Sequence, residues 1–321
     1  MQYRQLGSSG LRVSALTLGT MGFGGTGWAT PVGQIGVDGA REQIATARDA
    51  GINLIDTADV YSSGLSEEIL GEALGGDRDE VLIATKVRMP MGDGPNDAGL
   101  SRHHIVRAAE ASLRRLRTDY IDLYQVHEWD GQTPLEETLT ALDDLVRSGK
   151  VRYIGASNYH AWRLTRALWE SDRRAYVRYE SIQPKYNLVF RDEYERELEP
   201  LCLEQSIGVI PYSSLGSGFL SGKYHRGRDL PKTARAGNVQ KTYMTDRGFT
   251  VLEAVEKVAA AAGATPAQVA LSWLAHRPGI TAPIASATSV TQLKELLGGI
   301  ELQLDTEARA TLDRASAWQE G

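Results

Sequence analysis

The sequence predicts an α/β fold, a (β/α)8 TIM barrel with an N-terminal β-hairpin and an extra C-terminal helix. Eight short, mostly apolar runs alternate with longer amphipathic stretches, as parallel strands and the helices that cover them do. Three of these runs end at or beside an ionisable residue, namely Asp56, Lys86 and His127. Barrel enzymes carry their chemistry at this end of the strands, and 321 residues are within the length of one barrel.

A hairpin is expected before the barrel units. Residues 3–13 (YRQLGSSGLRV) form two short runs around Ser8, Ser9 and Gly10, and such a hairpin could close one mouth of the barrel. The eight strands that follow are expected at residues 16–20, 53–57, 81–86, 121–127, 151–157, 181–184, 208–212 and 281–286. Eight such units fit a barrel better than a six-stranded doubly wound sheet.

The expected helices lie between these strands and after the last of them. They span residues 38–50, 66–75, 101–117, 134–148, 160–170, 192–206, 246–277 and 290–298, and residues 306–319 form the extra helix. Ser66, followed by two glutamates and an apolar pair, predicts a capped start of the second helix. No break in composition divides the chain, so we expect one domain over residues 1–321.

The connection after Tyr212 is too long for an ordinary turn, because the next helix is expected only near Thr245. Its lysines and arginines predict a lid or a loop that binds an anionic ligand. A solvated loop without a ligand is the alternative.

Composition and charge exclude several classes of protein. A net charge of −6 and a pI near 5.6 argue against a nucleic-acid-binding surface. Cys202 is the only cysteine, which excludes an intrachain disulfide, and no acidic cluster accompanies the histidines, so we expect no metal site. Without a signal-like start or a long apolar stretch, we expect a cytoplasmic protein with no membrane partner.

Two glycine-rich stretches imitate nucleotide-binding motifs. Gly22, Gly24 and Gly27 match G-x-G-x-x-G, but no helix is expected to begin at the third glycine. The run 218–224 (GFLSGKY) has one residue too few between its glycines for a P-loop, and Tyr224 stands where that motif needs Ser or Thr. Neither stretch supports a Rossmann domain or a nucleotide hydrolase.

The three strand ends and Tyr61, in the loop after the second strand, form the expected active site. Adjacent barrel strands would place Asp56, Lys86 and His127 side by side. The ammonium of Lys86 favours a phenolate and should lower the pKa of Tyr61, while Asp56 keeps the lysine charged. His127 could hydrogen-bond a carbonyl oxygen. The group suits protonation of an oxygen while hydride reaches carbon; a purely structural pair of Asp56 and Lys86 is the alternative.

Seven stretches resemble those of the aldo-keto reductases and stand in the same order. They are NLIDTADVY, IATK, LYQVH, GKVRYIGASN, IQPKYN, VIPYSSLGSGFLSGKY and PIASATSVTQLKE. The resemblance covers about residues 3–300, and HEWDGQTPLEET is similar to the aryl-alcohol-dehydrogenase-like branch. It implies a (β/α)8 barrel, a nicotinamide cofactor extended across the mouth, and reduction of aldehydes or ketones.

The resemblance also implies roles for single residues. Tyr61 would donate the proton, tuned by Lys86 and Asp56, and His127 would orient the carbonyl. The implied cofactor contacts are Ser157, Asn158 and Gln183 at the carboxamide, Tyr212 stacked on the nicotinamide, Ser213, Leu215, Gly216 and Lys223 at the pyrophosphate, Ser286 and Thr288 at the adenosine phosphate, and Gln292 and Glu295 at the adenosine.

The family favours NADP(H), and NAD(H) is possible here. Many NADP-preferring members have a cation near Ser286 or Thr288, whereas hydroxyls stand at both positions of this chain. Leu296 stands where members usually have Asn, which removes one expected hydrogen bond to adenine.

Three functions stay open on the sequence alone: an oxidoreductase acting on a small carbonyl compound or alcohol, a Schiff-base lyase using Lys86, and a cofactor-sensing regulatory subunit. Trp28 and Trp129 fall in loops that could wall a substrate pocket, with ordinary packing as the alternative. The remaining tryptophans considered, Trp162, Trp169 and Trp273, are expected in the core or between helices, and Cys202 is expected to be a buried, inert thiol. The sequence predicts no particular oligomeric state.

Overall fold

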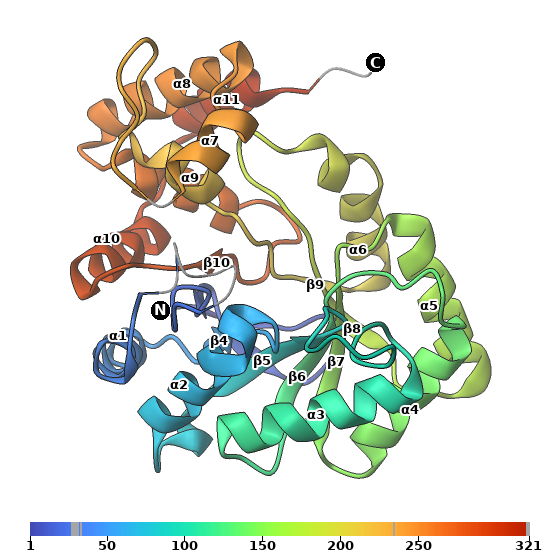
Figure 1. Ribbon diagram of the computed structural model, residues 1–321. Helices are drawn as coiled ribbons and strands as arrows, with labels where there is room; N and C mark the ends of the chain where they lie inside the picture. Colours follow the sequence, from blue (N-terminus) through green and yellow to red (C-terminus); the bar gives the residue numbers. More distant parts are fainter. Residues whose placement is uncertain (27–31, 33, 234, 319–321) are drawn as a thin grey trace.

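The computed structural model describes residues 1–26, 32, 34–233 and 235–318 (Figure 1). Its main sheet has eight parallel strands in the order β10-β3-β4-β5-β6-β7-β8-β9. The strands are β3 (Thr17–Gly19), β4 (Leu54–Asp56), β5 (Leu82–Val87), β6 (Ile121–Val126), β7 (Val151–Ser157), β8 (Tyr179–Gln183), β9 (Gly208–Val209) and β10 (Ile284–Ala285). The Thr281 N–H donates to the Val209 carbonyl at 2.8 Å, which joins the two edges of the sheet. The predicted barrel is confirmed.

Helices surround the strands, with α1 to α6 along one side of the ring and α7, α8, α9 and α11 gathered together (orange and red in Figure 1). Their bounds are α1 (Val37–Asp49), α2 (Leu65–Leu74), α3 (Arg102–Leu116), α4 (Leu135–Arg147), α5 (Ala161–Arg174), α6 (Glu199–Gln205), α7 (Ala236–Thr242), α8 (Asp246–Ala262), α9 (Pro266–Ala275), α10 (Val290–Glu301) and α11 (Thr306–Ser316). A π-helical turn (Tyr194–Leu198) precedes α6. The extra C-terminal helix is confirmed as α11.

The N-terminal hairpin of β1 (Tyr3–Gln5) and β2 (Arg12–Ser14) is antiparallel, as predicted. Leu6 and Val13 are fully buried and pack with apolar side chains of the barrel interior. The turn at Gly7 lies against Gly208, the first residue of β9. The hairpin therefore closes the N-terminal mouth of the barrel.

The side chains that point into the barrel form two layers, an apolar layer near the hairpin and a polar layer near the C-terminal ends of the strands. Side chains two residues apart point to the same face of a strand, so an interior apolar residue is followed by a site residue nearer the C-terminal end. The pairs are Leu54 with Asp56, Ala84 with Lys86, Leu123 with Gln125 and Ile210 with Tyr212. The closed end thus holds the core, and the open end holds the polar groups.

One predicted helix is wrong in its extent. Residues 246–277 form two helices, α8 and α9, that meet at 99°. Gly263 ends α8 in the left-handed conformation with a φ of 62°. Thr265 then begins α9 with a capping box to Gln268, and Pro266 occupies the first turn. In the described part of the chain, no single helix is long and apolar enough to cross a bilayer; α8 and α9 meet that criterion only when joined.

The long connection after Tyr212 contains structure that the sequence did not predict. It includes a 3-10 turn (Gly216–Ser221) and helix α7. Phe219 and Tyr243 are buried in it, and their rings stack with centroids 5.9 Å apart. The connection therefore has an apolar core of its own, which fixes its polar groups relative to the barrel.

Candidate active site

Lys86 lies at the centre of the polar layer and is fully buried. Its Nζ donates to Asp56 Oδ1 at 2.6 Å and to the Thr57 carbonyl at 2.8 Å, and it lies 3.4 Å from the Tyr61 hydroxyl. Burial opposes the charge, but Asp56 and Tyr61 together outweigh burial and raise the pKa of Lys86. The lysine is therefore a charged ammonium that touches the phenol.

Tyr61 begins a short turn after β4, where its N–H donates to the Ala58 carbonyl. Burial raises the pKa of Tyr61, and Lys86 opposes this rise without overcoming it. We predicted that Lys86 lowers the pKa of Tyr61. That is correct for the contribution of Lys86, but the pKa of Tyr61 as a whole is raised. The phenol stays protonated at neutral pH, which is the state that a proton donor requires.

His127 follows β6, and its ring meets the ring of Tyr61 edge-on with centroids 6.1 Å apart. Burial, together with the charges of Lys86 and Arg88, lowers the pKa of His127 to about 3. The imidazole is therefore neutral and can donate one hydrogen bond. Among the described residues, its buried Nδ1 has no hydrogen-bond partner.

Two glutamines hold Asp56 from the far side of the barrel. The amide groups of Gln125 and Gln183 both donate to Asp56 Oδ2, at 3.2 and 2.9 Å. Gly155 makes room for them, because a Cβ at this position would come within 3.2 Å of the Gln125 side chain and 2.5 Å of Ser181 Oγ. The sequence analysis missed Gln125, although its place midway between Leu123 and His127 predicts an inward direction.

The predicted nicotinamide residues lie at the same rim. Asn158 donates from Nδ2 to the His127 carbonyl at 3.0 Å and accepts from the Tyr212 hydroxyl at 2.9 Å. Ser157 donates to the Gln183 carbonyl at 2.9 Å. The backbone of Asn158 is left-handed with a φ of 54°, which turns its amide back across the strand ends. The structure thus brings Ser157, Asn158, Gln183 and Tyr212 together around His127 and Asp56.

The loop predicted to bind an anion carries Lys223 and Arg235, whose charges interact with each other. Burial lowers the pKa of Lys223, and the neighbouring charge of Arg235 adds to the effect. Burial also lowers the pKa of Arg235, whose charge interacts with Tyr61. Within the described residues, neither cation has a carboxylate within ion-pair distance. Arg235 is partly buried and Lys223 is exposed, and an anion near both would offset the repulsion between the two like charges. Arg235 was not singled out from the sequence.

The glycines of this loop are needed where they stand. Gly218 has a φ of 92°, and a Cβ there would lie 3.1 Å from Lys223 Nζ. Ser213 shares a hydrogen bond with the Tyr243 hydroxyl at 3.0 Å, and the Gly216 N–H donates to the Ser213 carbonyl. Leu215 packs against the outer core. These contacts place the loop residues predicted for the pyrophosphate beside one another.

The predicted adenosine residues lie at the start of α10. Thr288 donates from both its N–H and its hydroxyl to Gln292 Oε1, at 2.9 and 2.8 Å. Ser289 caps the helix by accepting from the Gln292 N–H. Ser286 lies against Gly19 of β3, and Glu295 accepts from Gln268 through its backbone carbonyl. A capped helix start of this kind favours a phosphate.

Comparison with known proteins identifies this arrangement. The family model described as the aldo/keto reductase family matches residues 15–317. The chain belongs to the aldo/keto reductase family. It is accordingly an NAD(P)H-dependent oxidoreductase.

Individual relatives of this aldo-keto reductase carry different names. An uncharacterized oxidoreductase of Bacillus subtilis, YrpG, is 39% identical over 96% of this chain and 93% of its own length. A probable voltage-gated potassium channel subunit beta of Arabidopsis thaliana is 36% identical over 94% of this chain and 92% of its own. The versiconal hemiacetal acetate reductase of Aspergillus parasiticus is 35% identical over 96% of this chain and 94% of its own.

Two buried acids of the reductase lie outside the proton-transfer group. Glu67 is fully buried, accepting from Arg115 at 2.7 Å and Thr85 at 2.5 Å, and is not a solvated helix-start residue. Asp59 is also fully buried, and neither oxygen has a partner among the described residues. Burial, and then Glu67, raise the pKa of Asp59 well above its ordinary range. Burial therefore favours the uncharged acid form of Asp59.

Ser66 does not cap α2 as predicted. The helix begins at Leu65 after Gly64, and the buried Ser66 hydroxyl lies 3.0 Å from that of Thr20 and 3.1 Å from that of Thr57. The serine therefore links the ends of β3 and β4 instead of the helix start.

The burial of the tryptophans agrees only in part with the prediction. Trp273 is buried as expected, but Trp162 and Trp169 on α5 are 56% and 60% exposed, so that prediction is wrong. Trp129 packs edge-on against Tyr159 at 5.3 Å, which favours its packing role. Trp28 and Gly27 lie outside the described residues.

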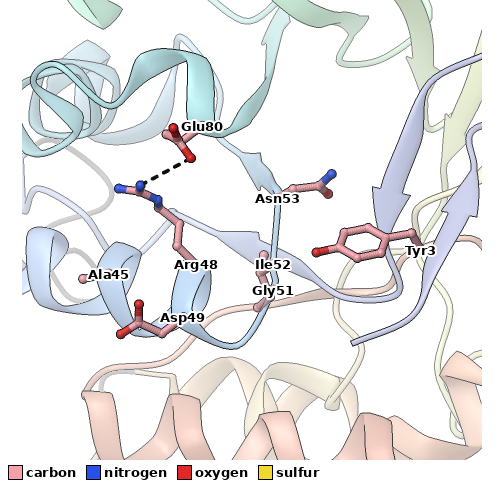
Figure 2. Close-up of a pocket in the computed structure, with 8 residues that line it drawn as sticks. All are labelled: Tyr3, Ala45, Arg48, Asp49, Gly51, Ile52, Asn53 and Glu80. Carbon is pink, nitrogen blue, oxygen red and sulfur yellow. Dashed lines mark ion pairs between the residues drawn. The ribbon is translucent and has the colours of Figure 1, made fainter.

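A polar hollow lies at the opposite end of the reductase barrel (Figure 2). Arg48 and Glu80 form an ion pair of 3.7 Å across it, and Tyr3 and Asn53 line it. Asn53 precedes β4, whereas Asp56 ends that strand. The hollow is therefore separate from the catalytic residues, at the end that carries stability in barrels.

Asp59→Asn should make the stability of the reductase less dependent on pH. The folded state holds the proton of Asp59 more tightly than the unfolded chain, whose aspartates titrate near ~4. Stability is therefore lost as pH rises from ~4 toward the folded-state pKa, and Asn removes that loss. Urea unfolding at pH 5 and pH 8 measures the change in the free energy of unfolding between the two pH values. Asp93→Asn, at an exposed loop position, is the control. Equal pH dependence in wild type and Asp59→Asn would contradict the assignment.

Proposed function

We propose that this reductase transfers hydride between a nicotinamide cofactor and a small aldehyde or ketone, or the corresponding alcohol, with Tyr61 as general acid and base. The observation that carries the proposal is the contact of one buried ammonium, Lys86, with both Asp56 and the Tyr61 hydroxyl. The cofactor, when bound, supplies or receives the hydride.

The residues act on the proton and on the carbonyl oxygen. Tyr61 gives its proton to that oxygen, and the ammonium of Lys86 stabilises the phenolate that remains. Asp56 keeps Lys86 charged through the cycle, and Gln125 and Gln183 keep Asp56 in place. A positioned acid of this kind contributes on the order of 10²–10⁴ in rate.

His127 orients the carbonyl without exchanging a proton. Because its pKa is about 3, the ring is neutral and donates a hydrogen bond that polarises the oxygen. The edge-on packing against Tyr61 puts this donor and the acid on one side of the reacting carbon. Both groups thus converge on one oxygen atom.

The residues present fit an extended nicotinamide dinucleotide. Ser157, Asn158 and Gln183 would hold the carboxamide, and Tyr212 would stack on the ring. Ser213, Leu215, Gly216, Lys223 and Arg235 would hold the pyrophosphate, and Ser286, Thr288, Gln292 and Glu295 the adenosine end. We favour NADP(H), because the capped start of α10, at the adenosine end, suits the additional phosphate of that coenzyme.

A Schiff-base lyase is disfavoured by the same lysine. Such enzymes need a neutral amine as nucleophile, which requires a lowered pKa. Asp56 and Tyr61 instead keep Lys86 protonated. A cofactor-sensing regulatory subunit is the second candidate, and the name of the Arabidopsis relative supports it. Retention of all four catalytic groups places the oxidoreductase first.

We also propose that the reductase works in the reducing cytoplasm. Burial raises the pKa of the Cys202 thiol to about 12, so this single cysteine is an unreactive thiol. A protein with one free thiol and no possible intrachain disulfide fits such a compartment.

Tyr61→Phe should lower kcat/KM for carbonyl reduction by roughly 10²–10⁴-fold, because the proton donor is lost while the ring is kept. The dissociation constant of NADPH, measured by protein fluorescence, should stay within a few-fold. Tyr120→Phe is the matched control, since its hydroxyl bonds Asp79 just before β6, at the closed end. Wild-type turnover by Tyr61→Phe would remove Tyr61 from the mechanism.

The pH dependence of carbonyl reduction should show no step from the ionisation of His127. Since the pKa of His127 is about 3 and that of Tyr61 is raised, kcat/KM should be constant from pH 5 to pH 9. It should fall only above ~10, where Tyr61 loses the proton that it must donate. Initial rates across this range test it; an inflection near pH 6.5 would show a histidine that changes charge.

Lys223→Met and Arg235→Met should each weaken NADPH binding roughly tenfold, because each removes a charged donor from a partly buried anion site. Fluorescence titration should also show tighter binding of NADPH than of NADH by the wild type. Lys150→Met is the control, as Lys150 pairs with Glu110 immediately before β7, at the closed end. Equal dissociation constants for the two coenzymes would contradict the NADP(H) preference.

A further inference from the structure

Arg88, just beyond the end of β5, has a backbone conformation that is unusual for a residue with a side chain. Its φ is 135°, whereas every other non-glycine residue with positive φ in the described chain lies between 50° and 60°. Its position is fixed on both sides: the Val87 carbonyl accepts from the His127 N–H, and the Arg88 carbonyl accepts from the Gly99 N–H, both at 2.9 Å. Such strain persists where the surrounding structure holds it, often at functional sites.

The conformation directs the Arg88 side chain to the neighbouring loop. Its Nη1 lies 3.2 Å from Glu128 Oε2, and Glu128 directly follows His127. The two side chains are 31% and 45% exposed, so both are accessible to a ligand. Among the described residues, the hydrogen bond to Met89 and this ion pair use only Nη1 and Oε2. The guanidinium therefore keeps free donors, and the carboxylate keeps a free acceptor.

The ion pair lies next to two of the proposed catalytic residues along the chain, because Glu128 directly follows His127 and Arg88 is two residues beyond Lys86. The charge of Arg88 contributes to the lowered pKa of His127. Burial first, and then nearby charges that include Tyr61 and Glu128, raise the pKa of Tyr212 to about 12. The pair is thus within electrostatic reach of both the residue that orients the carbonyl and the ring expected to stack on the nicotinamide.

We propose that Arg88 and Glu128 form a specificity site that binds a hydroxyl group next to the reacting carbonyl. The preferred substrates are then α-hydroxy aldehydes and α-hydroxy ketones, an inference that rests on the proposed carbonyl reduction. Arg88 donates to the hydroxyl oxygen, and Glu128 accepts its proton. An alkyl neighbour would leave the free donors of Arg88 and the free acceptor of Glu128 without a substrate partner, and a carboxylate neighbour would be repelled by Glu128.

The experiment compares glyceraldehyde with propanal, two aldehydes of equal chain length that differ in hydroxyl groups. The ratio of their kcat/KM values should fall roughly tenfold in Arg88→Met, the effect of about one lost hydrogen bond. Glu128→Leu should lower the same ratio. Hydration of glyceraldehyde in water is the same for every variant and therefore cancels. Arg88→Gly is a second variant, because glycine adopts a φ of 135° without strain.

Arg117→Met is the matched control, since Arg117 also has a positive φ (55°) and pairs with Glu72 at 2.9 Å, but follows the C-terminus of α3. It should keep the wild-type ratio. An unchanged ratio in Arg88→Met and Arg88→Gly, or equal losses on both aldehydes, would overturn the specificity site while leaving the reductase mechanism intact. A wild type that reduces neither aldehyde with either coenzyme would instead reject the carbonyl reduction and this inference with it.

Discussion

The buried ammonium of Lys86 is the constraint on which the active site depends. A charge without solvent is costly unless it is paired and fully hydrogen-bonded. Asp56 and the Thr57 carbonyl satisfy two of its donors, which leaves the third directed at Tyr61. Because the first two partners stabilise the folded structure, the contact with the phenol is already in place before any substrate arrives, and catalysis needs no rearrangement of these groups.

Barrel geometry explains how so many polar groups can be buried together. Each strand contributes apolar side chains near the hairpin and polar ones two residues further on, so the polar layer rests on a closed apolar core. Four strands meet at Asp56: its own β4, β5 through Lys86, β6 through Gln125, and β8 through Gln183. Gly155 of β7 leaves space for the side chain of Gln125 and for Ser181. The register of the sheet therefore sets the electrostatics of the site.

Several features that depend on a local sequence pattern were predicted correctly. Features that depend on contacts between residues far apart in the chain were missed. Asp56, Lys86 and His127 stand at the ends of apolar runs, so position alone placed them. The burial of Glu67 was not predicted, because its partner Arg115 is 48 residues away. The pKa of Tyr61 rises because burial outweighs the ammonium, and burial depends on the folded loops. The break between α8 and α9 was also missed, although Gly263 and the capping box of Thr265 are local signals that could have predicted it.

Different loops carry the residues proposed for the substrate and most of those proposed for the cofactor. The loops after β5 and β6 are joined through Asp130, which accepts from the Leu100 N–H and the Thr133 hydroxyl, and they carry Arg88 and Glu128. The groups predicted for the pyrophosphate and adenosine of the cofactor lie on the connection after β9 and around the start of α10. Asn158 bridges the two sides by bonding both the His127 carbonyl and Tyr212. If Arg88 and Glu128 set substrate preference as proposed, that preference can change without moving the proposed cofactor residues, because the two sets lie on different loops.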